Sequence, residues 1–288
     1  MSNFFEINKH HFDLRKFAQS ALEEDIKGGD VTSLSTIPSN AECTMQLLVK
    51  QDGIIAGVEA IKRILEIIYP EAQLNIFIND GKEVKKGDVV FLLSGNTQLL
   101  LSYERLILNI MQRMSGIATK TAYFQSLCNG TKAKVTDTRK TTPLFRFFEK
   151  WAVHIGGGYN HRWGLYDMVL IKDNHIDAAG GIDKAILACR DYLKKNNLQL
   201  PIEVETRNLD EVNIALKYLP DRIMLDNFSV NDAHKAIQLI NGKVQTEISG
   251  GINEHTLRQY AQTGVDLISI GALTHHISSL DLSLKILK

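Results

Sequence analysis

The stretch that decides the fold is PIEVETRNLDEVNIALKYLPDRIMLDNFSVNDAHKAIQLINGKVQTEISGG, residues 201–251. It alternates short β-rich runs with helical patterns, and the acidic residues Glu205, Asp226 and Glu247 recur at a constant spacing of 21 residues. This repetition is typical of parallel βαβ units. Because each apolar run ends in a polar residue and a loop, we expect that residue at the carboxyl-terminal edge of its strand, where α/β barrels carry their chemistry.

Further β-rich runs extend this pattern in both directions. AKVTDT (133–138) and MVLIKD (168–173) precede the stretch, and LISIGAL (267–273) follows it. They add up to about six βα units, fewer than the eight of a full barrel. The prediction is an incomplete α/β barrel, with a doubly wound open sheet as the competing arrangement.

The N-terminal part mixes helices and strands and predicts a separate α/β domain. HFDLRKFAQSALEED (11–25) has helical spacing, whereas CTMQLLVKQDGIIAG (43–57) is rich in strand formers. Between them, GGDVTSLSTIP (28–38) is expected to form a glycine-rich turn and a loop. SYERLILNIMQRMSGIAT (102–119) predicts an apolar helix with Ser102 as its N-cap.

Composition and charge exclude several classes of protein. The 288 residues are 44% hydrophobic and 23% charged, which excludes disordered and collagen-like chains. Lys+Arg and Asp+Glu are both 33, so a nucleic-acid coat or a polybasic membrane binder is not expected. Cys43, Cys128 and Cys189 are too few and too scattered for a disulfide framework or a zinc site. With neither a secretory signal pattern nor a membrane-spanning run, the expected location is the cytoplasm.

One segment concentrates positive charge in this neutral chain. From residue 139 to residue 173 it carries only three acids but six Lys/Arg: Arg139, Lys140, Arg146, Lys150, Arg162 and Lys172. Arginine forks match carboxylates and phosphates, and lysine adds point charge, so the segment suits a small, multiply anionic ligand. Solvated surface charge is the alternative. The glycines 156–158 either cradle a phosphate or act as a loop hinge.

The residues at the ends of the last four predicted strands indicate a binding site for a metal ion and one for a phosphate group. Glu205 and Asp226 hold equivalent positions, and two carboxylates that face one cavity can hold Mg²⁺, directly or through water, although strand-end capping explains either residue alone. ISGGIN (248–253) and SIGAL (269–273) place small residues where backbone N–H groups can meet a phosphate.

Together these motifs resemble the quinolinate phosphoribosyltransferase family. The resemblance rests on TDTRKTTP (136–143), GGGYNHRWGLYDMVLIKDNH (156–175), EVET (203–206), LDN (225–227), EISGGI (247–252) and ISIGALTHH (268–276). EDIKGGDVT (24–32) and ERLILNIMQRMSGIAT (104–119) look like the same family, so it covers nearly the whole chain. It implies an N-terminal α/β sandwich-like domain at 1–115 and an incomplete barrel at 116–274. The tail 275–288 is a candidate to pack back on the first domain.

The resemblance also implies a set of site residues. Arg105 would be donated across a homodimer interface, and Lys140, Glu205 and Asp226 would face the phosphoribosyl donor and Mg²⁺. The residues that would bind the dicarboxylate are Arg139, His161, Arg162 and Lys172. Those that would hold the phosphate are Thr138, Ser249, Gly250, Gly251, Ile270, Gly271 and Ala272. The chain departs from the family pattern at Leu144, Phe145, Trp151 and His154, which leaves their roles open.

The implied reaction transfers phosphoribosyl from 5-phosphoribosyl 1-pyrophosphate to quinolinate with decarboxylation. It gives nicotinate mononucleotide, CO₂ and pyrophosphate, a step of de novo NAD biosynthesis. Three alternatives remain: a lyase or isomerase with Lys172 as a Schiff-base amine, a related transferase acting on nicotinate, and a non-catalytic binder of a phosphorylated anion.

Overall fold

The computed structural model describes residues 4–287, which form two compact units. The first unit takes in the chain up to Ala122, Thr141–Gly157, and the chain from His276 onward. The second unit takes in Tyr123–Lys140 and Gly158–His275. Each unit is therefore assembled from segments that are distant in the sequence.

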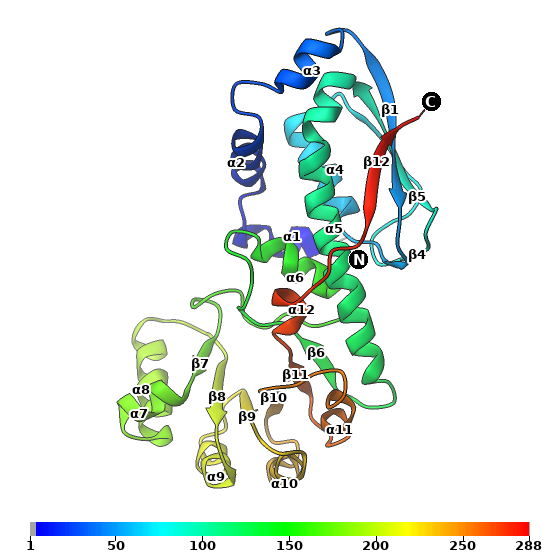
Figure 1. The fold of residues 1–288 in the computed structure, drawn as a ribbon. Helices are drawn as coiled ribbons and strands as arrows, with labels where there is room; N and C mark the ends of the chain where they lie inside the picture. Colours follow the sequence, from blue (N-terminus) through cyan, green and yellow to red (C-terminus); the bar gives the residue numbers. More distant parts are fainter. Residues whose placement is uncertain (1–3, 288) are drawn as a thin grey trace. The chain divides into compact units, whose positions relative to one another are not determined.

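The first unit is built on a four-stranded antiparallel sheet in the order β12-β1-β5-β3 (Figure 1). The strands are β1 (Glu42–Val49), β3 (Gln73–Ile76), β5 (Val89–Asn96) and β12 (Leu282–Ile286). Alternate residues of β1, namely Met45, Leu47 and Val49, are buried, as expected when one face of a sheet packs on a core. The C-terminal strand pairs with β1, with Ile286 opposite Met45.

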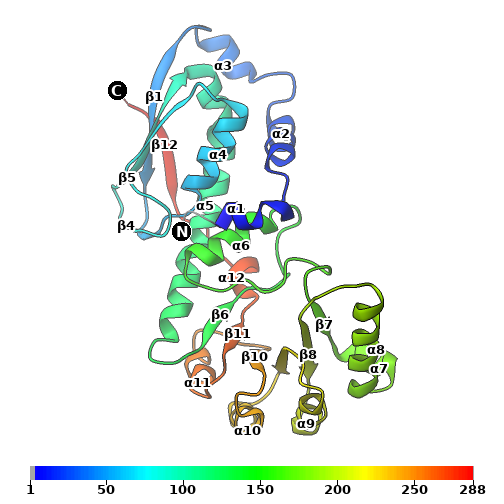
Figure 2. The same ribbon diagram turned by 180° about the vertical axis from the view of Figure 1, so that it is seen from behind.

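Helices pack beside this sheet (Figure 2). Among them, α4 (Val58–Ile68) buries Ile61, Ile64 and Leu65 at helical spacing. The remaining elements of the first unit are α1 (Phe4–Asn8), the 3₁₀ helix η1 (Lys9–His11), α2 (Leu14–Asp25), α3 (Val31–Thr36), β2 (Gly53–Ile54), β4 (Glu83–Val84), α5 (Thr97–Leu127, whose last turns belong to the second unit) and α6 (Arg146–Ile155).

Two local predictions are wrong. The expected loop after the glycines contains α3, because the Asp30 carboxylate accepts from the N–H groups of Thr32 and Ser33 and caps a helix there. Ser102 is not an N-cap, because α5 already begins at Thr97; its hydroxyl instead donates to the Gln98 carbonyl one turn earlier. No helix in the described part of the chain is long and apolar enough to cross a membrane.

The second unit is built on a six-stranded parallel sheet in the order β6-β11-β10-β9-β8-β7. Its strands are β6 (Lys134–Thr136), β7 (Val169–Ile171), β8 (Ile202–Thr206), β9 (Arg222–Asp226), β10 (Gln245–Ser249) and β11 (Leu267–Ser269). From β7 to β11 each strand pairs with the next one in the chain, as in a barrel, and the order does not reverse as in a doubly wound sheet. Six strands are too few for a full barrel, so the predicted incomplete α/β barrel is confirmed.

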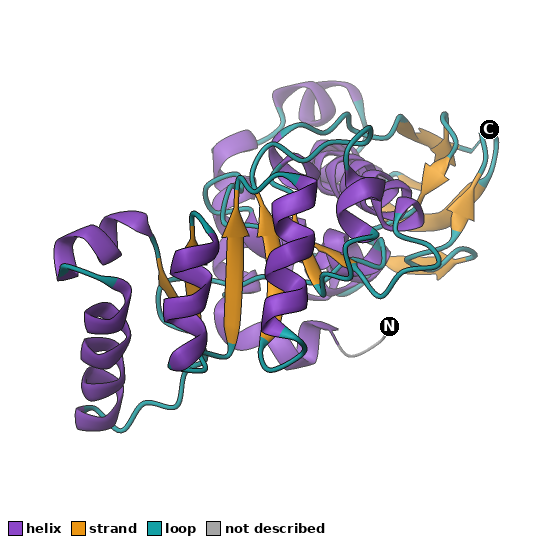
Figure 3. Ribbon diagram, turned by 90° about the horizontal axis from the view of Figure 1, so that it is seen from below, coloured by secondary structure: helices purple, strands orange, loops and turns teal. Residues whose placement is uncertain are grey.

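Helices connect these strands (Figure 3). They are α7 (Asp173–Ala179), α8 (Ile182–Lys195), α9 (Leu209–Lys217), α10 (Val230–Ile240) and α11 (Leu257–Ala261), and α12 (Ala272–His275) follows the last strand. Asn208 caps α9 and Ser229 caps α10, each within three residues of the end of a strand. This spacing explains the repeat of 21 residues and brings the carboxyl ends of the strands to one edge.

Candidate active site

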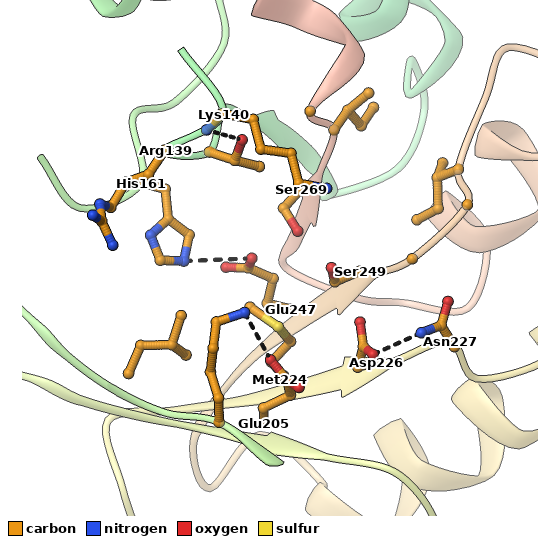
Figure 4. A pocket seen from close by; sticks show the side chains of 18 of the residues that line it. Arg139, Lys140, His161, Glu205, Met224, Asp226, Asn227, Glu247, Ser249 and Ser269 are labelled. Carbon is orange, nitrogen blue, oxygen red and sulfur yellow. Dashed lines mark hydrogen bonds and ion pairs between the residues drawn. The ribbon is translucent and has the colours of Figure 1, made fainter. Parts of the chain in front are cut away.

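A cavity of about 760 Å³ lies at this carboxyl-terminal edge of the parallel sheet (Figure 4). Nearly every residue that the resemblance assigns to the site lines it: Thr138, Arg139, Lys140, His161, Arg162, Lys172, Glu205, Asp226, Ser249, Gly250, Gly251, Ile270, Gly271 and Ala272. Arg105 is the exception. It is an exposed residue of α5 in the first unit and is not among the lining residues.

Four cationic side chains line the cavity, and hydrogen bonds fix the main chain of one of them, Lys140. The Thr138 hydroxyl accepts from the Lys140 N–H at 3.0 Å, and the Thr274 hydroxyl donates to the Lys140 carbonyl at 2.8 Å. The guanidinium of Arg162 donates to the carbonyl of Met168 at 3.1 Å. Burial, and then the positive charge of Arg139, lower the pKa of Arg162 below its ordinary value. Two arginines held together in this way favour a bound anion.

Two carboxylates lie at the ends of the neighbouring strands β8 and β9. Glu205 Oε2 lies 3.3 Å from Lys172 Nζ, and Asp226 Oδ2 accepts from the Asn227 side chain at 2.7 Å. Figure 4 shows Glu205 and Asp226 on adjacent strands of the cavity floor. Carboxylate oxygens of this kind are the ligands that hard divalent cations prefer.

The loop after β10 passes close to a neighbouring strand end. Gly250 has φ +102°, and a Cβ there would lie 2.1 Å from Asn227 Oδ1, so only glycine fits. The side chain of Ser249 and the backbone of Gly251 complete this part of the lining. A loop without side chains leaves backbone N–H groups accessible to a small anion.

Several lining residues were not predicted, and the most informative are acidic. Glu247 lines the cavity, and Glu203 lies below it; both are fully buried. His161 Nε2 lies 3.0 Å from Glu203 Oε2 and 3.6 Å from Glu247 Oε1. The sequence held a signal for both. The spacing of 21 residues relates Glu247 to Asp226 in the sequence, although in the sheet Glu247 lies opposite Met224 and Asp226 lies opposite Ser249. Glu203 lies two residues before Glu205, on the same face of the strand. The other unpredicted lining residues are Leu170, Met224, Asn227, Ile252, Ser269 and His275.

The basic segment is not one cluster in space. Arg146 and Lys150 belong to α6 in the first unit, where Lys150 is fully buried. The glycines 156–158 are not among the lining residues either. Gly156 is instead a packing position, because a Cβ there would lie 2.5 Å from the carbonyl oxygen of Ala118 in α5. The predicted phosphate-cradle role for this glycine loop has no support in the cavity.

Three of the four positions that depart from the family pattern belong to an aromatic cluster of the first unit. The rings of Trp151 and Phe4 are stacked with centroids 5.6 Å apart, and the ring of His154 lies 5.0 Å from that of Phe4. Burial lowers the pKa of His154, which favours its neutral form. Phe145 packs 4.9 Å from Phe148, whereas Leu144 is exposed at φ +62°, which nothing in the structure explains.

Comparison with known protein families decides the relationship. The family model for the C-terminal domain of quinolinate phosphoribosyl transferase matches residues 117–285, and the model for its N-terminal domain matches residues 30–115. The chain belongs to the quinolinate phosphoribosyltransferase family. The resemblance seen in the motifs is thus confirmed over nearly the full length.

Individual members of the quinolinate phosphoribosyltransferase family are similar to this chain in sequence and structure. The chain is 44% identical to the mitochondrial quinolinate phosphoribosyltransferase 2 of Nicotiana glauca, named as decarboxylating, over 96% of this chain and 82% of the relative. It is 39% identical to a probable nicotinate-nucleotide pyrophosphorylase (carboxylating) of Bacillus subtilis, over 96% of this chain and 94% of the relative. The solved nicotinate-nucleotide pyrophosphorylase of Francisella tularensis superposes with a TM-score of 0.88 at 38% identity, covering 95% of this chain and 96% of that one.

Proposed function

We propose that this protein transfers the phosphoribosyl group of 5-phosphoribosyl 1-pyrophosphate to quinolinate and releases CO₂, giving nicotinate mononucleotide and pyrophosphate. The observation that carries the proposal is one cavity lined by four cations, three carboxylates and two glycine-containing strand-end loops. A dicarboxylate and a phosphorylated donor need this excess of positive charge. The cytoplasm remains the expected location.

Arg139, Arg162 and Lys172 bind the two carboxylates of quinolinate in this proposal. A guanidinium can hold a carboxylate by two parallel N–H bonds, which fixes the orientation of the ring as well as its position. His161 was assigned to the same group, and it stands at the wall of the cavity. Both of its ring nitrogens have partners within the protein, so a direct contact with substrate stays a prediction for this residue.

The donor occupies the other side of the cavity in this proposal. Lys140 faces its pyrophosphate, and the 5′-phosphate meets the loops at Ser249–Gly251 and Ile270–Ala272. Glu205 and Asp226 fit Mg²⁺, because both offer carboxylate oxygens from neighbouring strand ends, directly or through water. When bound, Mg²⁺ neutralises the charge of the leaving pyrophosphate.

The chemistry follows from the arrangement of charges. As pyrophosphate leaves, positive charge develops at ribose C1, and the nearby carboxylates of Glu205 and Asp226 stabilise it electrostatically. The ring nitrogen of quinolinate attacks C1 and becomes a pyridinium. When the bond from C2 to its carboxylate breaks, the electron pair stays on C2, where the adjacent positively charged nitrogen stabilises it. CO₂ therefore leaves without a carbonyl cofactor, and C2 then takes up a proton from solvent to give nicotinate mononucleotide.

A lyase that uses Lys172 as a Schiff-base amine is the less favoured function. A nucleophilic lysine needs a neutral amine, which enzymes obtain by desolvation or by a neighbouring cation. The side chain of Lys172 is instead 49% exposed, and its Nζ lies 3.3 Å from the carboxylate of Glu205.

The assay that tests this proposal uses quinolinate labelled in its 2-carboxylate, the donor and Mg²⁺. We expect nicotinate mononucleotide and labelled CO₂ in equal amounts, and none without the donor. Turnover of a carbonyl substrate that borohydride traps on Lys172 would contradict the proposal.

We also propose a homodimer in which Arg105 completes the site of the partner subunit. The support is that Arg105 is exposed on α5 and is not among the lining residues of its own cavity. Inactive Arg105→Ala and Lys140→Ala proteins are mixed under conditions that exchange subunits. In a closed two-fold dimer about half of the dimers are mixed, each with one intact site, so about a quarter of the wild-type activity should return. If no activity returns although subunit exchange is verified, Arg105 does not contribute to the site of the partner subunit.

A further inference from the structure

At the wall of the cavity, His161 contacts two acids that have no part in the proposed reaction. Glu203 and Glu247 have no measurable exposure, and His161 is 8% exposed. Arg222 reaches both acids, with its Nη1 at 2.9 Å from Glu247 Oε2 and 3.5 Å from Glu203 Oε2. Figure 4 shows His161 and Glu247 pointing toward each other across this part of the cavity. Burying two carboxylates is costly unless they are paired and do specific work.

The hydrogen bond at Nδ1 of His161 defines its tautomer. The backbone N–H of Arg162 points to Nδ1 of His161 at 2.7 Å. A backbone N–H is always a donor, so Nδ1 must be the unprotonated, accepting nitrogen. The proton therefore resides on Nε2, which lies 3.0 Å from Glu203 Oε2. The ring is thus held at both ends, by the carboxylate on one side and by the main chain of Arg162 on the other.

The main chain around His161 is held from a second direction as well. The Asp137 carboxylate, which follows β6 and is fully buried, accepts from the His161 N–H at 2.8 Å and from the Asn160 side chain at 2.7 Å. His161 and Arg162 are consecutive, so anything that fixes the imidazole also fixes the point from which the Arg162 guanidinium leaves the backbone. The charge of Glu203 also acts on Arg162 directly and opposes the repulsion from Arg139.

A metal ion is the other use that such a group could have. His161, Glu203 and Glu247 place one possible ligand atom each within 4.8 Å of one another. The guanidinium of Arg222, however, already lies against the oxygens of both acids. A fixed positive charge at ion-pair distance from both carboxylates opposes a cation at the same oxygens. The cluster is therefore better suited to orienting a side chain than to holding a metal.

We propose that Glu203 and Glu247 are positioning residues that fix His161 as the Nε2–H tautomer and, through its Nδ1, hold the main chain from which Arg162 reaches into the cavity. Arg222 keeps the two carboxylates in place. In many functional histidines an outer partner on one ring nitrogen sets the tautomer and the orientation of the ring. Here the outer partner is Glu203 at Nε2, and the ring then holds Arg162 through Nδ1. The consequence for the reaction rests on the proposed binding of quinolinate by Arg162, whereas the tautomer does not.

The tautomer is tested first, on the unmodified protein without substrates. Nitrogen-15 NMR of protein labelled in its nine histidines separates protonated from unprotonated ring nitrogens, and the signals that disappear in His161→Gln assign the residue. We expect a protonated Nε2 and an unprotonated Nδ1. A proton on Nδ1, a fully protonated ring, or a stoichiometric bound metal in the purified protein would overturn the proposal.

Variants then test the link to substrate binding. Glu203→Gln keeps an oxygen that can accept from Nε2–H, whereas Glu203→Ala removes it. We expect Glu203→Ala to raise the quinolinate KM about tenfold, the scale of losses known for outer partners of functional histidines. The donor KM and the melting temperature of Glu203→Gln should change little, and Glu203→Gln should recover most of the quinolinate KM. Glu254→Ala, an exposed acid of the same unit, is the matched control.

Two results would count against the positioning role. One is an unchanged quinolinate KM and an unchanged His161 tautomer in Glu203→Ala. The other is a parallel loss of kcat, both KM values and thermal stability in Glu203→Ala and Glu203→Gln alike, which would mean a general structural role. If the wild-type tautomer is as expected but quinolinate is not a substrate, the proposed function fails and the tautomer assignment stands.

Discussion

Two regions of the molecule share one basic stretch of sequence and use it differently. At the strand ends, Arg139 and Arg162 line a cavity, where burial and then the charge of Arg139 lower the pKa of Arg162. In α6, charged side chains are buried instead. Glu149 is fully buried, and its Oε1 lies 2.6 Å from Nη2 of Arg113. The comparison teaches that charge density along a sequence does not define a site. What separates the two regions is that one follows β-strands whose carboxyl ends converge.

We expect the largest effect, a loss of kcat, from substitutions of the two carboxylates Glu205 and Asp226 in the cavity. The double variant Glu205→Gln, Asp226→Asn should lower kcat at least about a hundredfold, because removing one group that stabilises developing charge typically costs that much. Binding of quinolinate alone, measured by calorimetry, should change little. Unchanged turnover would show that these carboxylates are structural and would remove the functional side of the comparison.

In the α6 region we expect a loss of stability instead of activity. Arg113→Ala leaves Glu149 as a buried charge without its closest ion-pair partner, which should lower the free energy of unfolding by about 3 kcal/mol. Urea denaturation measures this, with the exposed Arg15→Ala on α2 as the control. The quinolinate KM of the folded variant should stay at its wild-type value. A stability equal to that of Arg15→Ala would contradict the structural reading of this region.

A third change compares one arginine from each region directly. Arg162→Ala should raise the quinolinate KM by about 10- to 100-fold, since charged hydrogen bonds contribute about 1.5–3 kcal/mol. Arg146→Ala, from α6, should leave that KM unchanged, because Arg146 donates to Thr141 within the first unit. Steady-state kinetics at saturating donor gives both values. Equal KM values for the two variants would contradict the inference that Arg162 binds quinolinate and Arg146 does not.

The smallest expected effect depends on pH. Burial, and then the charge of Glu203, raise the pKa of Glu247 from 4.5 to about 7. The folded state then binds more protons than the unfolded state between those values, so this group lowers stability as the pH rises through the window. Glu247→Gln has nothing to ionise. Its free energy of unfolding should therefore improve relative to wild type from about pH 5 to about pH 7.5, while Glu254→Gln shows no such trend.

The sequence predicted the second unit better than the first for a physical reason. Strands and helices that repeat every 21 residues leave a regular pattern, and the parallel sheet follows from it. The first unit depends on local capping and on contacts between distant segments. The Asp30 cap that turns an expected loop into α3, and the pairing of Ile286 with Met45, have no periodic signal.

The sequence motifs predicted the site residues at the ends of the strands, but they did not predict the charged residues that lie earlier in the strands. Lys140 and Glu205 stand at strand ends, so their positions could be read from the sequence. Glu203 and Arg222 lie before the carboxyl ends of β8 and β9, and a charged residue inside a strand suggests an exposed position in the sequence. The structure instead buries Glu203 fully and leaves the Arg222 side chain 17% exposed. His161 could be noticed, but its hydrogen bonds could not.

The central claim is that the cations of the cavity select a dicarboxylate, and substrate discrimination tests it most directly. The kcat/KM values for quinolinate and for nicotinate, which lacks one carboxylate, are measured in the same assay with the same donor and Mg²⁺. We predict a preference for quinolinate of at least about a hundredfold, because nicotinate leaves cationic groups of the cavity without their partner. Equal kcat/KM values, or a preference for nicotinate, would contradict the account.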